Sequence, residues 1–263
     1  MSRLLNKLGY QFNDFIFNVH LFPMGMVVKY YYHSYFLKKK YIELNIKKKE
    51  FNNIYLKIRC RNGIDRKVLH YVFFDKFHHT PSVYLNKKSP VIVDLGSNIG
   101  CTIVDLKVRY PDAVIFGYEM DLENYNLAIN NCSNFSKVHL FNKAVWIKND
   151  VIKYNKTMHS DSYSITSEKD SKGILVDCVC MVTIIKENSL ENIDFLKMDI
   201  EGAEINILND TDLSWLNFVL SFNIEFHNIS ETELNFYVDK LTNIGFRVWK
   251  SKSHWNAIEG VKD

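Results

Sequence analysis

The sequence lacks a long uninterrupted run of apolar residues. Its most apolar early stretch, residues 15–28, is broken by residues such as Asn18 and Pro23 and is too short to span a bilayer. Residues 1–15 also contain no continuous apolar segment of the kind found at the centre of a signal peptide. We therefore expect no transmembrane segment and no signal peptide, and peripheral membrane contact is not favoured.

Cysteines are few, and their spacing excludes the common paired motifs. The five cysteines form no Cys-x-x-Cys sequence, and an odd number fits no complete set of disulfides. Cys178 and Cys180 alternate along an apolar segment, so we expect both on one face of a strand as small hydrophobic residues. Reduced thiols and a cytoplasmic location are the expectation that follows.

Strong charge of one sign is also missing. The chain has 33 Lys and Arg residues against 30 Asp and Glu residues, a net charge of +3. Nucleic-acid binding needs a concentrated basic surface. The lysine runs at residues 38–40 and 47–49 are better explained as a solvated helix end and a loop. Nucleic acid is therefore not an expected partner.

What is present, from Pro90 onward, is an alternation of short apolar runs with helical patterns. Helices are expected through about Arg109, over residues 122–132 and over residues 232–242. Strands are expected at residues 91–96, 113–119, 137–145, 193–199, 216–225 and 245–250. Strands that alternate with helices pair in parallel, so the sequence predicts an α/β fold with a mostly parallel, doubly wound sheet.

The remaining regions predict the domain organisation. We expect an N-terminal appendage over residues 1–54, mainly helical and of helical/strand character, and a main domain over residues 55–263, with its core at residues 90–250. Many aromatic side chains lie among the first 40 residues. Such a surface is typical of packing against the main domain or against a second subunit, which would make a homodimer.

A polar insert, residues 146–173, separates the third and fourth predicted strands. A β-hairpin is expected to turn at Asn149 and Asp150, and a further strand is expected at residues 174–182. We expect the insert and the aromatic N-terminal region to cover a binding pocket.

Polar residues follow five of the predicted strands at their carboxyl ends. They are Asp94–Gly100, Glu119, Asn142, Asp199–Glu204 and Glu225–His227. Ligands of doubly wound sheets bind beyond the carboxyl ends of the strands. The sequence therefore places a binding site at this edge.

The loop DLGSNIGCT, residues 94–102, narrows the choice of ligand. No Gly-Lys-Ser or Gly-Lys-Thr occurs in the chain, which excludes a P-loop. Counted from Gly96, a dinucleotide fingerprint would need glycines where Asn98 and Cys101 stand, which disfavours an NAD-linked oxidoreductase. The alternative is that this loop binds no ligand and only connects a strand to a helix.

The pattern that remains suits S-adenosylmethionine. Glu119 ends the next predicted strand, where a carboxylate can accept hydrogen bonds from both ribose hydroxyls. Asp94 and the backbone of Gly96 and Gly100 would hold the methionyl group. The positive sulfonium would also make the acidic rim of the site tolerable.

Three segments resemble the FkbM-type S-adenosylmethionine-dependent methyltransferases. They are VIVDLGSNIGCT (91–102), IFGYEMD (115–121) and DFLKMDIEGAE (194–204), within a resemblance that covers roughly residues 55–250. The resemblance implies a Rossmann-like class I methyltransferase fold and methylation of a hydroxyl of a sugar, a glycan or a secondary metabolite.

The resemblance also assigns individual positions. Matching positions are Asp94, Gly96, Asn98 and Gly100 in the glycine loop, Glu119 as the ribose acid, Lys197, Asp199, Glu201, Gly202 and Glu204 after the fourth strand, and Glu225 and His227 after the fifth. Asn142 stands at the expected adenine edge, where methyltransferases often have an acid.

Oxygen is the preferred acceptor atom. Enzymes that methylate amino groups of bases or amides commonly end the fourth strand in [DNS]-P-P-[YFW], whereas this chain reads Asp199-Ile-Glu-Gly. An alcohol is a poor nucleophile, so a base or a metal is expected nearby. His227 is the candidate base because imidazole titrates near neutrality, and Asp199 and Glu225 complete the catalytic group. Asp199 is also a candidate contact to the methyl donor and so counts among the cofactor-binding residues.

Two other interpretations stay open. Asp199, Glu201 and Glu225 could hold Mg²⁺ through their oxygens, although a site without metal is favoured. A non-catalytic adenosyl- or carbohydrate-binding module of the same fold would keep the glycine loop without a base. The presence of Asp199, Glu225 and His227 speaks against that module. Glu201 and Glu204 also suit the start of a helix, where acids complement the dipole.

Overall fold

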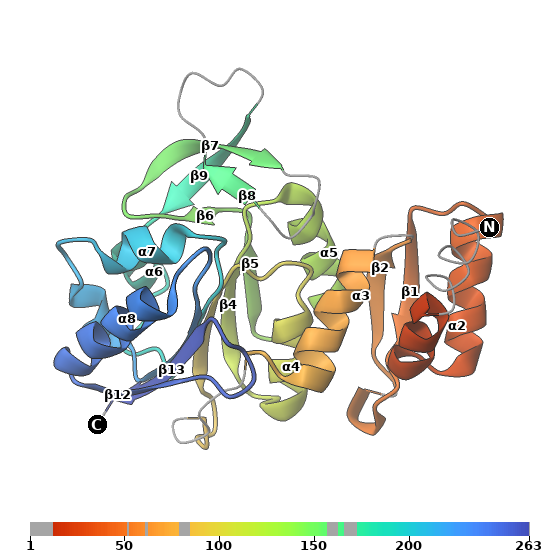
Figure 1. The fold of residues 1–263 in the computed structure, drawn as a ribbon, viewed down its shortest axis with the longest axis horizontal. Helices are drawn as coiled ribbons and strands as arrows, with labels where there is room; N and C mark the ends of the chain where they lie inside the picture. Colours follow the sequence, from red (N-terminus) through yellow and green to blue (C-terminus); the bar gives the residue numbers. More distant parts are fainter. Residues whose placement is uncertain are drawn as a thin grey trace. The chain divides into compact units, whose positions relative to one another are not determined.

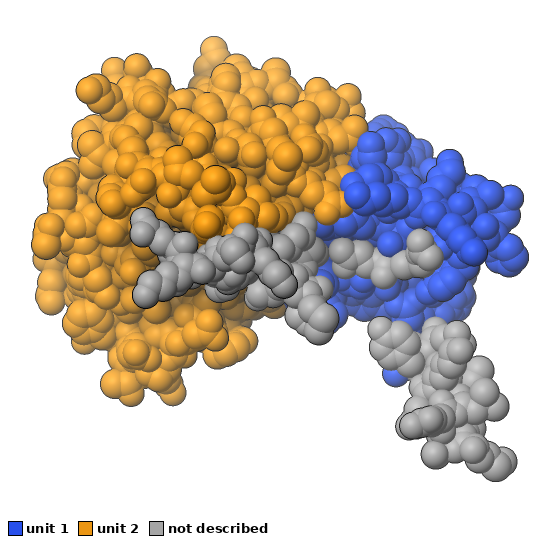
Figure 2. Space-filling model, turned by 90° about the horizontal axis from the view of Figure 1, so that it is seen from above, with its two compact units in different colours: residues 1–74 blue, residues 75–263 orange. Residues whose placement is uncertain are grey.

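The chain forms two compact units, which Figure 2 shows in different colours. The computed structural model describes residues 13–51, 53–60, 63–78, 85–156, 163–165 and 173–262. The units are Met1–Phe74 and Asp75–Asp263. The division falls later than the expected one after residue 54, because the strand that begins at Tyr55 pairs within the first unit. Residues 1–12 of the expected appendage lie outside the described residues.

The first unit combines helices with a two-stranded antiparallel sheet. Its elements are a helix over residues 13–21, α2 (Met24–Tyr31), the π-helical turn η1 (Tyr32–Phe36), β1 (Tyr41–Asn45), the 3₁₀ turn η2 (Lys49–Phe51), β2 (Tyr55–Arg59), α3 (Gly63–His70) and the π-helical turn η3 (Tyr71–Asp75). A buried ion pair of 2.6 Å between Arg59 and Asp65 fastens the start of α3 to the end of β2. The unit therefore combines helices with strands, as the expected helical/strand appendage does.

The second unit is built on a seven-stranded sheet (Figure 1). Its order is β12-β13-β11-β10-β3-β4-β5. The strands are β3 (Val91–Leu95), β4 (Val114–Tyr118), β5 (Val138–Phe141), β10 (Phe195–Met198), β11 (Ser221–Glu225), β12 (Phe246–Lys250) and β13 (Ala257–Lys262). Strands β5, β4, β3, β10 and β11 pair in parallel, and β13 runs antiparallel to both of its neighbours. The expected mostly parallel α/β sheet is confirmed, with β13 as an additional strand.

Helices cover both faces of this sheet. They are α4 (Cys101–Arg109), α5 (Leu122–Cys132), α6 (Met181–Glu187), α7 (Ala203–Leu208), the 3₁₀ turn η5 (Ser214–Phe218) and α8 (Glu231–Asn243). Figure 1 shows α4 and α5 on one side of the sheet and α6, α7 and α8 on the other. Local signals set their starts: Asp121 caps α5, and Ser230 and Glu233 form a capping box at α8. Buried apolar side chains of the sheet and of α6, α7 and α8 form one continuous core.

The insert and the residues that flank it form a separate four-stranded sheet. Its order is β6-β9-β7-β8, from β6 (Ala144–Val145), β7 (Asp150–Lys156), β8 (Tyr163–Ile165) and β9 (Ile174–Val179). The hairpin expected at Asn149 and Asp150 is wrong, because β9 lies between β6 and β7 and pairs with both. The Asn149 side chain instead donates to Thr183 and accepts from the backbone of Cys180, which ties this turn to α6.

The expected strand at residues 174–182 ends early. Strand β9 stops at Val179 and α6 begins at Met181, so Cys178 is a buried strand residue whereas Cys180 precedes the helix. None of the five cysteines, all of which lie among the described residues, forms a disulfide. Within the described part of the chain, no helix has the length and hydropathy that crossing a bilayer requires.

Candidate active site

The glycine loop between β3 and α4 lies directly against the loop that follows β10. Gly96 has φ +79°, and a Cβ there would stand 1.7 Å from the carbonyl oxygen of Asp199. Only glycine fits such a backbone contact. Gly100 has φ +84° and precedes the first turn of α4, where a Cβ would stand 3.0 Å from Cys132 Sγ and 3.1 Å from Ala128 Cα. The two glycines therefore allow the close approaches that shape this loop.

Glu119 fixes the other side of this loop. Its Oε2 accepts a hydrogen bond of 2.8 Å from the backbone N–H of Asn98, and its Oε1 accepts one of 2.8 Å from that of Asp121. Burial raises the pKa of Glu119 to about 7, although these two hydrogen bonds act to lower it. Each carboxylate oxygen keeps lone-pair capacity for one more donor.

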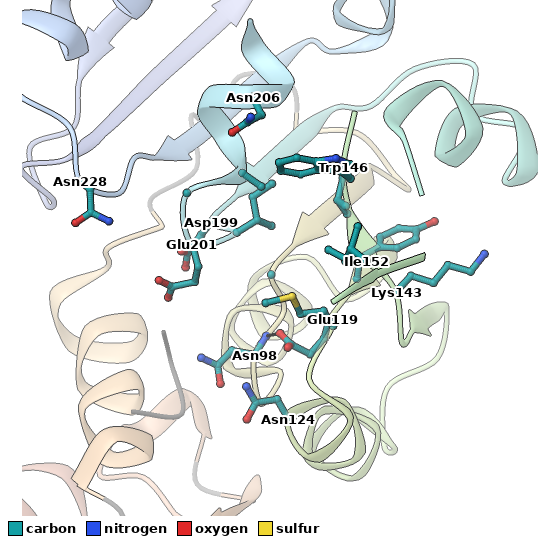
Figure 3. Close-up of a pocket in the computed structure, with 18 residues that line it drawn as sticks. Asn98, Glu119, Asn124, Lys143, Trp146, Ile152, Asp199, Glu201, Asn206 and Asn228 are labelled. Carbon is teal, nitrogen blue, oxygen red and sulfur yellow. Dashed lines mark hydrogen bonds between the residues drawn. The ribbon is translucent and has the colours of Figure 1, made fainter. Parts of the chain in front are cut away.

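A cavity of about 320 Å³ opens beside Glu119. Figure 3 shows Asp199 and Glu201 on one side of it, and Trp146 and Ile152 from the insert on another. The cavity thus joins an apolar wall to an acidic one. Sequence reasoning expected the insert to cover the pocket; Trp146 and Ile152 do line it, whereas residues 157–162 and 166–172 lie outside the described residues.

The predicted cofactor residues divide between the cavity wall and its support. Gly96, Asn98, Glu119 and Asp199 line the cavity. Three others do not. Asp94 is fully buried behind the loop, Gly100 lies at the start of α4, and Asn142 donates through its Nδ2 to the backbone carbonyls of Glu119 and Met120. Asn142 therefore uses its amide protons to hold the end of β4 in place, and its role at the adenine edge stays a prediction.

Lys197 places a buried cation behind the cavity. Its Nζ lies 3.2 Å from Asp94 Oδ1 and 3.5 Å from Asp199 Oδ2, and it donates to the carbonyl of Gly96 at 2.6 Å. Burial lowers the pKa of Lys197, but the charges of Asp94 and Asp199 outweigh burial and raise it. The lysine therefore stays charged and connects β3, β10 and the glycine loop.

Glu204 supports the loop after β10. Its fully buried carboxylate accepts hydrogen bonds from the backbone N–H of Ile200 at 2.7 Å and of Gly202 at 2.8 Å. The backbone there is unusual, with φ +57° at Glu201 and +103° at Gly202. Glu204 thus stabilises a backbone conformation with positive φ, which is uncommon at a non-glycine residue such as Glu201.

His227 stands at the centre of the acidic side. Its Nδ1 lies 3.2 Å from Glu204 Oε1, and its Nε2 lies 3.5–3.7 Å from oxygens of Asp199, Glu201 and Glu225. Burial lowers the pKa of His227, but the hydrogen bond to Glu204 and the charges of Asp199 and Glu201 raise it to about 10. The imidazole therefore does not titrate near neutrality, the premise on which the sequence made it the candidate base.

Two further histidines adjoin this cluster, and sequence reasoning did not single them out. His78 Nε2 lies 3.6 Å from Asp199 Oδ2, and His254 Nε2 lies 3.6 Å from Glu225 Oε1. Burial lowers the pKa of His78 to about 3 and also lowers that of His254, whereas burial and the charge of Asp199 raise the pKa of Glu225 to about 8. Neither histidine follows a parallel strand of the sheet, so the strand-end pattern could not reveal them.

The sheet order, the glycine loop after β3 and the acid after β4 define a Rossmann-like class I methyltransferase. The chain belongs to the FkbM methyltransferase family, because the family model described as "Methyltransferase FkbM domain" matches residues 100–248. The resemblance found in the sequence is confirmed.

Individual proteins with related sequences or structures are distant. "Methyltransferase sdnD" of Sordaria araneosa is 25% identical over 158 residues, which cover 47% of this chain and 61% of that protein. The chain thus spans about three fifths of that relative. Among solved structures, the fibrillarin pre-rRNA processing protein of Methanococcus jannaschii is similar with 11% identity, a TM-score of 0.45 and coverage of 85% of this chain and 94% of that one. A methyltransferase from Pyrococcus furiosus has 11% identity, a TM-score of 0.43 and coverage of 80% and 90%.

Proposed function

We propose that the protein is an S-adenosylmethionine-dependent O-methyltransferase that acts on a hydroxyl of a sugar, a glycan or a secondary metabolite. The observation that carries the proposal is the cavity that joins Glu119 and the glycine loop to the carboxylates of Asp199 and Glu201. Its volume lies at the lower end of the range for small-molecule sites. A methyl donor with a positive sulfonium would meet the acidic wall, and its adenine would meet the apolar one.

The chain's own residues suit the parts of that cofactor. Glu119 keeps one lone pair on each oxygen for the ribose hydroxyls, and the backbone of Gly96 and Asn98 lies open to the methionyl end. Trp146 and Ile152 offer an apolar surface for the adenine. When bound, the sulfonium supplies the methyl group. Asp94 and Lys197 act from behind the wall, by holding Gly96 and Asp199 in position.

The acceptor would bind at the Asp199 end. His227 Nε2 lies 3.7 Å from a carboxylate oxygen of Asp199 and 3.5 Å from one of Glu225. We assign to these three residues the contacts to the acceptor hydroxyl. The uptake of its proton falls to Glu225, whose pKa is raised to about 8, because His227, with a pKa raised to about 10, is already protonated near neutral pH. Alignment of the two reactants accounts for the remaining rate enhancement.

Binding of S-adenosylhomocysteine tests the cofactor assignment. We expect Glu119→Ala to weaken the affinity by roughly tenfold or more, because the ribose hydroxyls lose a bidentate acceptor. Isothermal titration calorimetry of the purified protein measures it. Glu191→Ala, which removes an exposed carboxylate, is the matched control and should bind like wild type. Absence of binding to wild type would overturn the proposal, and NAD⁺ binding in its place would revive the oxidoreductase interpretation.

The same titration should depend on pH. Burial raises the pKa of Glu119 to about 7, so below that pH the carboxyl group is mostly protonated and accepts fewer hydrogen bonds. Ribose hydroxyls favour the charged form. The affinity for S-adenosylhomocysteine should therefore rise as the pH increases from about 5.5 to about 8 and then level off. Glu119→Gln should flatten this rise, and an unchanged pH profile in that variant would show that another group titrates.

A further inference from the structure

The surroundings of His227 Nε2 have the spacing of a metal site. Glu201 Oε2 and Glu225 Oε1 each lie 3.5 Å from this nitrogen, and Asp199 Oδ1 lies 3.7 Å from it. These separations are longer than a normal hydrogen bond. Ligands bound about 2.1 Å from a tetrahedral ion stand roughly 3.4 Å apart. The three carboxylates therefore surround the nitrogen at the separation of ligands around a shared ion.

The other ring nitrogen of His227 is fixed in the way typical of metal-binding histidines. Its Nδ1 lies 3.2 Å from Glu204 Oε1, and Glu204 is itself held by two backbone N–H groups. A carboxylate that orients a ligating imidazole through its second nitrogen is a recurrent feature of metal centres. The ring is thus aimed with Nε2 toward Asp199, Glu201 and Glu225.

Two buried imidazoles give an independent indication. The His78 and His254 side chains are only 11% and 10% exposed, and their Nε2 atoms point at Asp199 and Glu225 from 3.6 Å. Neither Nδ1 atom has a hydrogen-bond partner among the described residues. The Nε2 atoms, on the side of each ring that faces the carboxylates, lie close enough to contact a polar ligand that Asp199 and Glu225 attract.

The charges around Asp199 also favour a cation. Asp94, Asp199, Glu201, Glu204 and Glu225 gather here, and Lys197 already pairs with two of them. Buried carboxylates are normally paired with cations or bound to metals. Asp199, Glu201 and His227 each offer an atom within 4.8 Å of the other two, which is compact enough for one ion.

We propose that Asp199, Glu201 and His227 bind one divalent transition-metal ion. The sequence by itself suggests oxygen ligands for Mg²⁺ and favours no metal; the structure adds an oriented imidazole. Nitrogen ligands shift the preference from Mg²⁺ and Ca²⁺ toward Mn²⁺, Fe²⁺, Co²⁺, Ni²⁺ or Zn²⁺. Three protein ligands leave a coordination position for another molecule, as in catalytic rather than structural sites.

The ion's role, though not its binding, rests on the proposed function. Asp199 and Glu201 also line the cavity, so the ion would stand at the wall where the acceptor enters. A hydroxyl bound to the open position would have a lowered pKa. Its O–H bond would break with the proton passing to the Glu225 carboxylate, and the electron pair would remain on the oxygen as the nucleophile.

Direct metal titration tests the site without any assay of activity. The protein, prepared without a polyhistidine tag and stripped with EDTA, is titrated with Co²⁺ and separately with Mg²⁺ by calorimetry. We expect one Co²⁺ per chain, bound at least tenfold more tightly than Mg²⁺. His227→Ala and Glu201→Gln should each weaken Co²⁺ binding at least tenfold. His139→Ala, which removes an exposed imidazole on β5, should leave it unchanged.

Two outcomes would overturn the proposal: no saturable Co²⁺ binding to wild type, or equal Co²⁺ affinity in His227→Ala and wild type. Circular dichroism checks that each variant is folded, and Glu201→Gln replaces His227→Ala if the latter is not. Titrating the same preparations with S-adenosylhomocysteine separates the two proposals. Binding of that ligand without Co²⁺ binding removes the metal site alone, whereas Co²⁺ binding without it removes the proposed cofactor and leaves the metal site standing.

Discussion

Lys197→Met should destabilise the protein by about 3–5 kcal/mol, because it leaves a buried charge without its partner. Lys197 is 2% exposed and lies 3.2 Å from Asp94, which is fully buried. Methionine fills much of the same volume, so the loss reflects charge more than packing. Chemical denaturation at pH 7 measures the effect, and Lys186→Met, at an exposed position on α6, is the control expected to change stability by less than about 0.5 kcal/mol.

The pH dependence of that loss identifies its cause. Without the lysine, burial raises the pKa of Asp94 further above its value in the unfolded chain, so the folded variant binds an extra proton at lower pH. The stability deficit relative to wild type should therefore shrink as the pH falls from about 7 to about 5. A deficit that is the same at both pH values would show that packing, and not the unpaired carboxylate, causes the loss.

Gly96→Ala should abolish binding of S-adenosylhomocysteine and destabilise the second unit by more than about 3 kcal/mol. The new Cβ would stand 1.7 Å from the Asp199 backbone oxygen, so the glycine loop and the loop after β10 would have to separate. Backbone atoms cannot move aside as a flexible side chain can. Thermal denaturation and calorimetric titration measure the two effects.

A substitution at Gly245 distinguishes the cost of backbone strain from the cost of a steric clash. Gly245 has φ +104°, and a Cβ at this position would meet no atom within 4 Å, so Gly245→Ala should cost only the left-handed conformation, about 1–2 kcal/mol. If Gly96→Ala and Gly245→Ala lowered the free energy of unfolding equally, the contact with Asp199 would add nothing to the destabilisation. A Gly96→Ala variant that binds the ligand normally would show that this loop is not part of the cofactor site.

Local sequence was sufficient for the elements that form the parallel part of the sheet. The runs at Val91–Leu95 and Val114–Tyr118 are apolar because both faces of a parallel strand are covered by helices. Parallel pairing then places their carboxyl ends at one edge. That rule is why Gly96, Glu119 and Asp199 were predicted to lie close together, and they do line one cavity.

Strand β13 shows where local signals fail. Its sequence, AIEGVK, contains Glu259 and Gly260, which are unfavourable in strands. The glycine is required by a distant residue, since a Cβ there would stand 2.3 Å from the Phe222 ring on β11. Glu259 is satisfied by the Trp249 indole N–H and the Ser251 hydroxyl. Neither reason is visible within a short window of sequence.

The sequence by itself determined the fold class, the family and the edge of the sheet at which the polar residues gather, because these follow from motifs, from periodicity and from the direction of parallel strands. Only the tertiary structure decided which polar groups face the cavity. The Asn142 amide donates to the backbone at the end of β4, Asp94 pairs with Lys197, and His78 and His254 lie beside Asp199 and Glu225 although neither follows a parallel strand. Side-chain direction and contacts between distant segments depend on packing, which no local pattern encodes.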